Sequence, residues 1–394
     1  MYKQMEGFNL DETIKNKKNI IIKNIIFFTI TIAIITAITL YVCNDNFRQA
    51  IDTYVFKKEL SHDEATYIEL DGDTNQYVYA YDKYIVTLKK GMLNSYISSG
   101  SKVSTTEVTI GNPIFNSNGR YICLAEKDGQ KIYLISGENI IWQKEVEGNI
   151  SKISVNKNGY VSAIIKGTTY KTVIITFNAE GKELFKTYLS TTNAVASDIS
   201  NDNKYLAIAE INSSGSTIGS NVKIISIQKA GTDPTNSIVY TYKSEANNLI
   251  TNIKYQDRGV LACMYSDGIH LIYDQKDELL INSDNDTNYM DINLKNMAVI
   301  VQNKQKGLLN SQSQVIIKDI NNKSESLYTI ENLISGLYVS ESKIAASIGS
   351  EIHFIDSSGC VKKKYKANQE ITNIVLGDSI AGIVYRDKVD VIGL

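Results

Sequence analysis

A turn followed by a short apolar strand recurs at intervals of about 35–45 residues along this chain, and this repeat constrains its fold most strongly. A Gly or Asn at the turn accepts positive φ at low cost, and small alanines in the strand allow close packing. The copies lie at 116–125, 156–163, 200–207, 256–262 and 340–345. Two further strands around a polar turn follow at 131–142, 173–185, 268–280 and 351–359. Each repeat therefore supplies four strands, which cannot bury both faces alone.

Four-stranded units at this period predict an all-β fold, an eight-bladed β-propeller. The predicted blades are 76–110, 113–149, 151–190, 196–243, 250–281, 289–330 and 334–368. The tail supplies three more strands, at 371–376, 380–385 and 389–393, and we expect 67–70 to supply the fourth. Pairing the two ends closes the ring and removes exposed sheet edges. Seven blades are the alternative, if the first and last units merge. We expect the extra residues 212–220 to form a loop outside the fourth blade.

The units resemble the degenerate blades of WD-type and quinoprotein-like propellers, in which a strand, a turn with Gly and a closing Trp follow in this order. Trp142 stands at such a closing position. The whole arrangement is similar to an uncharacterised family of single-pass, membrane-anchored β-propeller proteins from spore-forming Gram-positive bacteria. The resemblance covers nearly the whole chain. It implies the fold and assigns no activity to any residue.

An uncharged run from Ile25 to Cys43 precedes the repeats and approaches the roughly 20 apolar residues that span a bilayer. We expect its threonines to return their hydroxyls to the preceding helical turn. Lysines lie before the run, which predicts a cytoplasmic N-terminus and an external C-terminal domain in the cell membrane. The alternatives are a cleaved signal peptide, a lipid anchor at Cys43 and a buried soluble helix. Tyr41 and Val42 are bulky where a signal peptidase requires small residues.

These patterns divide the chain into four predicted parts. They are a cytoplasmic segment at 1–24, a transmembrane helix at 25–43, an amphipathic stalk at 44–63 and an extracytoplasmic propeller at 64–394. Apolar residues at helical spacing between Phe47 and Val55 predict a helix in the stalk.

Composition argues against several classes of function. The net charge is −2, without a basic block beyond the membrane flank, so we expect no nucleic-acid partner. The cysteines at 43, 123, 263 and 360 form neither a metal-binding nor a disulfide pattern. A single tryptophan argues against a quinone cofactor, because such enzymes lock the ring with several tryptophans.

We assign no catalytic, cofactor-binding or metal-binding residue from the sequence. His270 and His353 take the same place in two units, but the unit between them carries Ile316 there, and spacing fixes no third ligand. His62 has no visible partner. Asp71-x-Asp73-x-Asn75 and Asp284-x-Asp286-x-Asn288 resemble the start of a calcium loop without its remainder, which favours polar turns.

We therefore predict a non-enzymatic protein–protein interaction scaffold or receptor in the cell envelope, attached to the membrane through 25–43. Its expected partner is an envelope protein or peptide, with no cofactor or metal. The alternatives are a sensor that binds a small ligand or glycan in the propeller funnel, and an envelope hydrolase or lyase. A scaffold is expected to carry an apolar, tyrosine-rich patch on one end face, without convergent carboxylates. An enzyme is expected to gather acidic or histidine side chains with shifted pKa values in the funnel.

Overall fold

The computed structural model describes residues 10–43, 51, 60–61, 66–72, 76–305 and 311–394. The chain divides into two compact units, Met1–Lys58 and Glu59–Leu394. Most of the predicted stalk, His62, and Asp73 to Asn75 of the first calcium-like segment lie outside the described residues.

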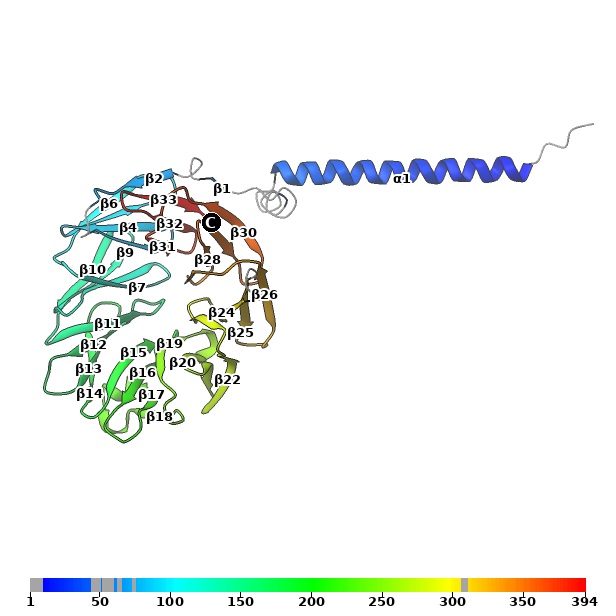
Figure 1. The fold of residues 1–394 in the computed structure, drawn as a ribbon. Coiled ribbons are helices and arrows are strands. Elements are labelled where there is room, and N and C mark those ends of the chain that lie inside the picture. The colour runs from blue at the N-terminus through cyan, green and yellow to red at the C-terminus, as the bar shows by residue number, and fades with distance from the viewer. Residues whose placement is uncertain (1–9, 44–50, 52–59, 62–65, 73–75, 306–310) are drawn as a thin grey trace, which may run out of the picture. The chain divides into compact units, whose positions relative to one another are not determined.

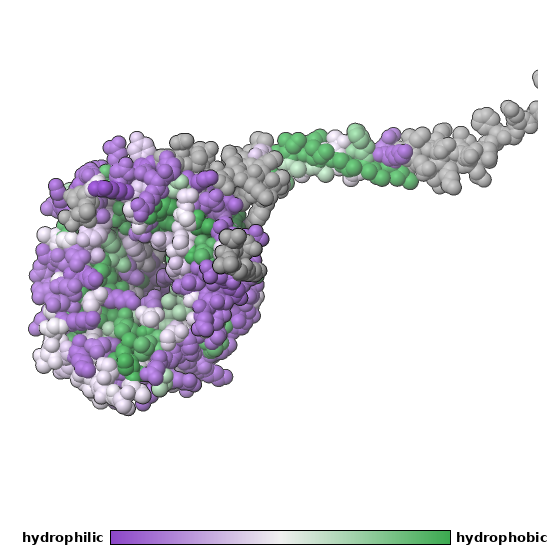
Figure 2. Space-filling model, in the orientation of Figure 1, coloured by the Kyte–Doolittle hydropathy of each residue, from purple (hydrophilic) through white to green (hydrophobic). Residues whose placement is uncertain are grey.

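The long helix of the first unit is α1 (Leu10–Cys43). Its part from Ile22 to Tyr41 is long and apolar enough to cross a membrane, as an anchor or as a signal sequence. Figure 2 shows most of this part as hydrophobic, with a hydrophilic patch at the end next to the grey residues. The expected threonine bonds are confirmed, because the hydroxyls of Thr31, Thr36 and Thr39 donate to carbonyls four residues earlier at 2.8, 2.8 and 2.9 Å. The helix begins fifteen residues before the predicted span at Ile25, within the lysine-rich segment.

The second unit is a ring of eight sheets, each with four antiparallel strands, which confirms the eight-bladed propeller (Figure 1). Alternating and continuous runs of Ile, Val and Ala form the strands, because β-branched and small residues suit sheets buried between neighbouring sheets. Blades 1 to 7 each use four consecutive strands, and blade 8 combines the last three strands with one from the start of the unit.

The strands of blades 1 to 4 follow in chain order. Blade 1 contains β3 (Tyr77–Tyr81), β4 (Tyr84–Lys89), β5 (Met92–Tyr96) and β6 (Lys102–Glu107). Blade 2 contains β7 (Pro113–Asn118), β8 (Tyr121–Glu126), β9 (Lys131–Ser136) and β10 (Asn139–Glu145). Blade 3 contains β11 (Asn149–Val155), β12 (Val161–Lys166), β13 (Thr172–Phe177) and β14 (Glu183–Leu189). Blade 4 contains β15 (Asn193–Ile199), β16 (Tyr205–Asn212), β17 (Gly219–Ser226) and β18 (Ile238–Lys243), with α3 (Ile227–Ala230) and η2 (Pro234–Asn236) between β17 and β18.

The remaining blades complete the ring. Blade 5 contains β19 (Ile250–Tyr255), β20 (Leu261–Tyr265), β21 (Gly268–Tyr273) and β22 (Lys276–Asn282), with η3 (Asp257–Gly259) after β19. Blade 6 contains β23 (Thr287–Asp291), β24 (Met297–Gln305), β25 (Ser311–Asp319) and β26 (Glu325–Ile330). Blade 7 contains β27 (Gly336–Val339), β28 (Ile344–Ile348), β29 (Glu351–Ile355) and β30 (Val361–Lys366). Blade 8 contains β31 (Asn373–Leu376), β32 (Ile380–Val384), β33 (Lys388–Gly393) and β2 (Thr66–Glu69).

The ring closes as the sequence predicts, by pairing the first long strand of the propeller with the last. Strand β2 lies antiparallel to β33, with Thr66 opposite Val391 and Glu69 opposite Lys388. In Figure 1 this pair appears as a blue strand beside a red one. One pairing was not predicted: β1 (Leu60–Ser61) adds a parallel fifth strand to β30 of blade 7. Two residues carry no periodic pattern, so this strand left no signal in the sequence.

Blade 4 also differs from the prediction. The expected loop 212–220 is shorter, because β16 and β17 extend as a hairpin in which Asn212 lies opposite Gly219. The larger excursion is the segment between Ser226 and Ile238, which contains α3 and η2. The Gly, Ser and Asn residues of 212–220 predicted a loop there. The segment after Ser226 begins with the apolar Ile227 and resembles the continuation of a strand, so its sequence did not predict an excursion.

The first strands of the blades lie innermost, where several of them contact the first strands of neighbouring blades. Turns between first and second strands, and between third and fourth strands, meet at one end of the ring. We call this end the turn face. Because loops on a rigid scaffold are free to vary, this is where a recognition site is expected.

Candidate functional site

A cleft on the turn face opens between blades 4 and 5, and we call it the tyrosine cleft. It has a volume of about 590 Å³, which is within the range of roughly 300–1,000 Å³ found for ligand pockets. Ile224, Leu261 and Ile272 supply apolar lining. The aromatic lining consists of Tyr205, Tyr240, Tyr242, Tyr255 and Tyr273. This cleft agrees with the expectation of a tyrosine-rich, partly apolar patch on one end face. The accompanying expectation of no convergent carboxylates is not met, because Asp82, Glu341 and Asp378 line a second hollow.

The local sequence explains why the cleft stays open. The segment between Ser226 and Ile238 carries α3 and η2, and after it β18 presents Tyr240 and Tyr242 toward blade 5. On the blade 5 side, a two-residue turn of Asp274 and Gln275 joins β21 to β22, both residues having positive φ. So short a turn leaves the tyrosines of β18 partly uncovered.

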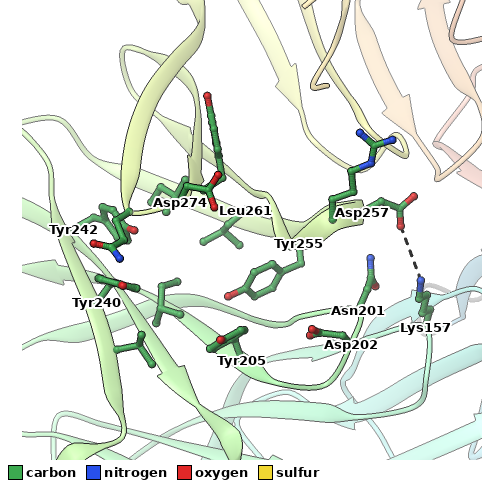
Figure 3. A pocket seen from close by; sticks show the side chains of 17 residues that line it. Lys157, Asn201, Asp202, Tyr205, Tyr240, Tyr242, Tyr255, Asp257, Leu261 and Asp274 are labelled. Atoms are coloured by element: carbon green, nitrogen blue, oxygen red, sulfur yellow. Dashed lines mark ion pairs between the residues drawn. The ribbon is translucent and has the colours of Figure 1, made fainter. Parts of the chain in front are cut away.

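Tyr255 forms the floor of the cleft at the end of β19. Its side chain is 6% exposed, and in Figure 3 its hydroxyl points toward the side of the cleft where Tyr240 lies. Its backbone N–H donates to Asp198 Oδ2 at 2.6 Å. Burial raises the pKa of the Tyr255 hydroxyl well above its usual range, and the nearby Asp198 and Asp202 add to the effect. Tyr255 is therefore a neutral hydroxyl held by a fixed backbone.

Asp198 anchors this floor from blade 4. It is buried and accepts hydrogen bonds from Tyr255 N and from Ser154 Oγ, the latter at 2.7 Å. Burial raises its pKa, while these hydrogen bonds oppose the rise. Because the contacts join blades 3, 4 and 5, the cleft floor is tied to three neighbouring sheets.

A belt of hydrogen bonds continues this linkage around the turn face. Each bond joins the turn after one blade's first strand to the next blade, so the turns hold one another in place. Examples are Asn156 Nδ2 to Ser200 O at 3.0 Å, Gln256 Nε2 to Ile292 O at 2.8 Å and Asp378 N to Asp82 O at 2.7 Å.

The charged side chains of the cleft are divided between its two ends. Figure 3 shows Lys157, Asn201 and Asp257 at one end, and Tyr240, Tyr242 and Asp274 at the other. At the first end, the hydrogen bond from Asn296, followed by the ion pairs with Lys295 and Lys157, lowers the pKa of Asp257. The ammonium groups of Lys295 and Lys157 lie 3.7 and 3.9 Å from its carboxylate.

A second, smaller hollow lies at the mouth of the central channel and brings carboxyl groups together. Its lining includes Asp82, Glu341 and Asp378, beside Lys254. Burial raises the pKa of Asp378 to about 6, with further contributions from Glu341 and Asp82. Lys254 Nζ donates to Asn293 O at 3.1 Å and to Glu341 Oε1 at 3.4 Å. The hollow measures about 130 Å³, below the usual range for ligand pockets.

The two histidines take corresponding register positions in blades 5 and 7, with blade 6 between them. His270 lies between Asp277 and Asp267, at 2.9 and 3.1 Å. His353 is buried and contacts the Tyr328 hydroxyl at 2.5 Å and Glu351 at 3.3 Å. The structure therefore does not bring the histidines together. Within the described parts of the chain, no group of three or more His, Cys, Asp or Glu side chains is arranged to hold a metal ion.

The other residues considered in the sequence take structural positions. Trp142 is 7% exposed and packs against Phe177 of blade 3, with ring centroids 5.5 Å apart. Asp284 closes a turn by accepting from Thr287 Oγ1 at 3.0 Å and Gln302 Nε2 at 2.8 Å. Asp71 forms an ion pair with Lys89.

The cleft residues themselves were not named by sequence reasoning. The sequence contains 25 tyrosines, and nothing local separates those that line a cleft from those that fill a core. One signal was available: blade 4 carries a long segment before its last strand, and blade 5 carries a two-residue turn at the same place. Comparing turn lengths between neighbouring repeats would have pointed to this boundary.

The fold and the cleft define an eight-bladed β-propeller protein with a tyrosine-lined cleft on its turn face. The chain belongs to a family described as a family of unknown function (DUF5711), whose profile matches residues 56–394. The match confirms the prediction that the chain belongs to an uncharacterised family of propeller proteins. No curated protein matches the chain at the sequence level.

Among solved structures, the chain is similar to several proteins of low sequence identity. Sqt1 of Chaetomium thermophilum, bound to the N-terminus of the ribosomal protein L10, is 10% identical, with 84% of this chain and 99% of that chain covered and a TM-score of 0.50. The β-propeller domain of Cps50 (Swd1) from Myceliophteria thermophila is 10% identical, covering 83% and 99%, with a TM-score of 0.45. Apo AztD from Citrobacter koseri is 12% identical, covering 82% and 94%, with a TM-score of 0.46. These likenesses concern the fold.

Proposed function

We propose that this chain is a membrane-anchored, extracytoplasmic scaffold or receptor that binds a protein or peptide partner in the tyrosine cleft without catalysing a reaction. The cleft carries the proposal: it combines five tyrosines and aliphatic side chains in about 590 Å³ on a face of interlocked turns. Tyrosine supplies large contact area and a hydrogen-bonding group at low entropic cost, as recognition surfaces require.

The membrane address of the proposal comes from α1. The apolar part from Ile22 to Tyr41 serves as the anchor, and the lysines before it favour a cytoplasmic N-terminus. This address is tested with two fusions to the C-terminus, one to a reporter that is active only outside the cytoplasm and one to a reporter that is active only in the cytoplasm. Activity of the first fusion supports the address, and activity of the second fusion alone overturns it.

The propeller fold is compatible with recognition of a peptide segment. Sqt1, which has the same fold, is bound to the N-terminus of the ribosomal protein L10. For this chain the supporting observation remains the cleft itself.

The proposal is tested with full-length protein purified from solubilised membranes. Wild type is compared with the double variant Tyr240→Ala, Tyr242→Ala, and stable partners are identified by mass spectrometry. The matched control replaces the exposed tyrosine pair of blade 3, Tyr170 and Tyr188, whose ring centroids lie 4.7 Å apart. We expect a partner that copurifies with wild type and the control and is lost from the cleft variant. Equal recovery with all three proteins would overturn the proposed site.

One observation favours a second candidate, an envelope hydrolase or lyase. Asp82, Glu341 and Asp378 line one hollow, and Asp378 has a pKa raised to about 6, which suits an acid–base group. The same hollow is where a small ligand or glycan sensor would bind. Its volume of about 130 Å³ and the ion pair between Glu341 and Lys254 make both less well supported than the scaffold. Cleavage of purified cell-wall glycan by wild type, and not by Asp378→Asn, would favour the enzyme.

A further inference from the structure

The tyrosine hydroxyls of the cleft provide unused hydrogen-bonding groups. Among the residues that the structure describes, the hydroxyls of Tyr205, Tyr240, Tyr242 and Tyr255 have no hydrogen-bond partner, whereas Tyr273 donates to Glu278. Tyr255 is the most firmly held of these residues, because the residue is almost fully buried while its hydroxyl points into the cleft (Figure 3). A hydroxyl that a buried ring holds in place loses little entropy when a bound polar group uses it, so it is suited to bind such a group.

The charges around these tyrosines indicate the sign of that group. The cations among the lining residues, Lys157 and Arg258, belong to turns nearest the channel, and Asp257 forms an ion pair with Lys157. On the tyrosine side, Asp274 has no ion-pair partner in the described structure. Asp202, which Figure 3 shows beside Asn201, pairs with Lys204. Burial raises the pKa of Tyr242, and the neighbouring Tyr240 and Asp277 raise it further. The tyrosine end therefore lies among acidic groups.

At the edge of the tyrosine cleft, a tyrosine ring and a carboxylate already hold a cation. Lys323 Nζ lies 5.6 Å from the ring centroid of Tyr273 and 3.5 Å from Glu278. A cation over an aromatic face is attracted by the ring quadrupole, and the attraction grows when the cation is desolvated. The cleft offers four further tyrosines, and among the described residues no lysine or arginine lies over their rings.

From this we infer that the tyrosine end of the cleft binds a basic side chain, arginine or lysine, presented by an extended peptide segment of the partner. The ammonium or guanidinium group lies among Tyr240, Tyr242 and Tyr205, donates to the Tyr255 hydroxyl and faces the Asp274 carboxylate. This inference rests on the proposed function and names the chemistry of its partner.

Selection from a displayed library of random peptides tests the inference, with full-length protein in lipid nanodiscs as the target. We expect enriched peptides to share an arginine or lysine. Replacing that residue with the uncharged citrulline or glutamine is expected to weaken binding roughly five- to thirty-fold. Peptides without a shared basic residue, or failure to enrich any peptide, would overturn the inference.

Paired substitutions then locate the bound cation. Tyr240→Phe keeps the aromatic face and should retain most of the affinity, whereas Tyr240→Leu should lose roughly five- to thirty-fold. Asp274→Asn, on an exposed turn, should weaken the binding of basic peptides several-fold without altering the thermal stability of the protein. Tyr188→Leu on blade 3 is the control and should change nothing. Equal binding by Tyr240→Phe and Tyr240→Leu would contradict a cation over the ring.

The two proposals fail in different ways. If enriched peptides bind equally well after their basic residue is neutralised but still depend on Tyr240, the cleft is a docking site and only the cationic inference fails. If their binding is unaffected by both Tyr240→Leu and Tyr242→Leu, the peptides bind elsewhere, and both proposals fail.

Discussion

Trp142 in blade 2 and Tyr240 in blade 4 take the same register position in the last strand of their blades, yet one closes a boundary and the other lines an opening. Trp142 lies opposite Leu134, and Tyr240 lies opposite the corresponding Ile224. Trp142 is buried against blade 3, whereas Tyr240 is half-buried at the edge of blade 5.

The difference arises in the neighbouring blade. Blade 3 joins its last two strands by a turn in which Gly181 lies directly on the Trp142 ring, so that an added Cβ would fall 2.7 Å from Trp142 Cγ. Blade 5 has only Asp274 and Gln275 at this place. An aromatic residue at one repeat position therefore becomes part of the core or lines a cleft, according to the turn that covers it.

Removing the two aromatic side chains should give the largest contrast. Trp142→Ala is expected to lower the free energy of unfolding by about 3–5 kcal/mol, because it leaves a cavity under Gly181. Tyr240→Ala should cost about 1 kcal/mol, since its ring is already partly hydrated. Urea denaturation of both variants measures the two values. Equal losses would show that the boundary between blades 4 and 5 is packed as tightly as that between blades 2 and 3.

The glycine that covers Trp142 provides a second test of the closed boundary. Gly181→Ala should destabilise by about 1–3 kcal/mol, because φ is +78° and the new methyl group meets the indole ring. Gly219→Ala is the control: a Cβ there meets no atom within 4 Å, so we expect a change within about 0.5 kcal/mol. Thermal or urea unfolding of both variants gives the comparison. Similar stabilities of the two variants would contradict the role given to Gly181.

Exchanging the turns should convert one boundary into the other. Replacing Asp274 and Gln275 by the blade 3 turn sequence Asn-Ala-Glu-Gly-Lys is expected to cover Tyr240 and weaken partner binding at least about tenfold, or about 1.4 kcal/mol. The measurement is affinity for the partner or an enriched peptide, with circular dichroism as the folding control. Unchanged affinity in a folded protein would show that turn length does not control access.

The smallest expected effect concerns pH. His270 of blade 5 occupies the position that Ile175 takes in blade 3. The pKa of His270 is raised, chiefly by its hydrogen bond with Asp277. Burial opposes this rise, and the nearby Asp267 adds to it. The charged His270 therefore stabilises the folded state. This stabilisation is fully present below a pH of about 6.5 and is lost as the pH rises through the raised pKa of His270 in the folded protein.

The variant His270→Gln isolates this contribution, which we expect to reach about 1 kcal/mol. The difference in unfolding free energy between wild type and variant should shrink as pH rises, as measured by urea denaturation across the range. A difference that is constant, or grows with pH, would contradict the charged pair.

Much of the fold was accessible from the sequence because propeller blades repeat their turn and strand chemistry. The predicted unit at 250–281 corresponds to strands from Ile250 to Asn282, and the strand predicted at 67–70 closes the ring as β2. Even the unit at 76–110, the least regular copy, is an ordinary blade. Repetition made these elements predictable, since each copy supported the others.

The cleft was less accessible because it depends on a mismatch between blades. Tyr205 begins the second strand of its blade, as Tyr121 does in blade 2. Only the contrast between the long segment after Ser226 and the short turn after Tyr273 identifies Tyr205 as a cleft residue. The clustering of Asp82, Glu341 and Asp378 from three blades likewise follows from ring closure, which brings distant turns together.

The central claim, that the boundary between blades 4 and 5 receives the partner, is tested most directly by site-specific photocrosslinking in intact membranes. A benzophenone amino acid replaces Tyr240 in one protein and Tyr188 in another. We predict a discrete adduct with a second polypeptide from position 240 and none from position 188. No adduct at 240, or the same adducts from both positions, would contradict the account.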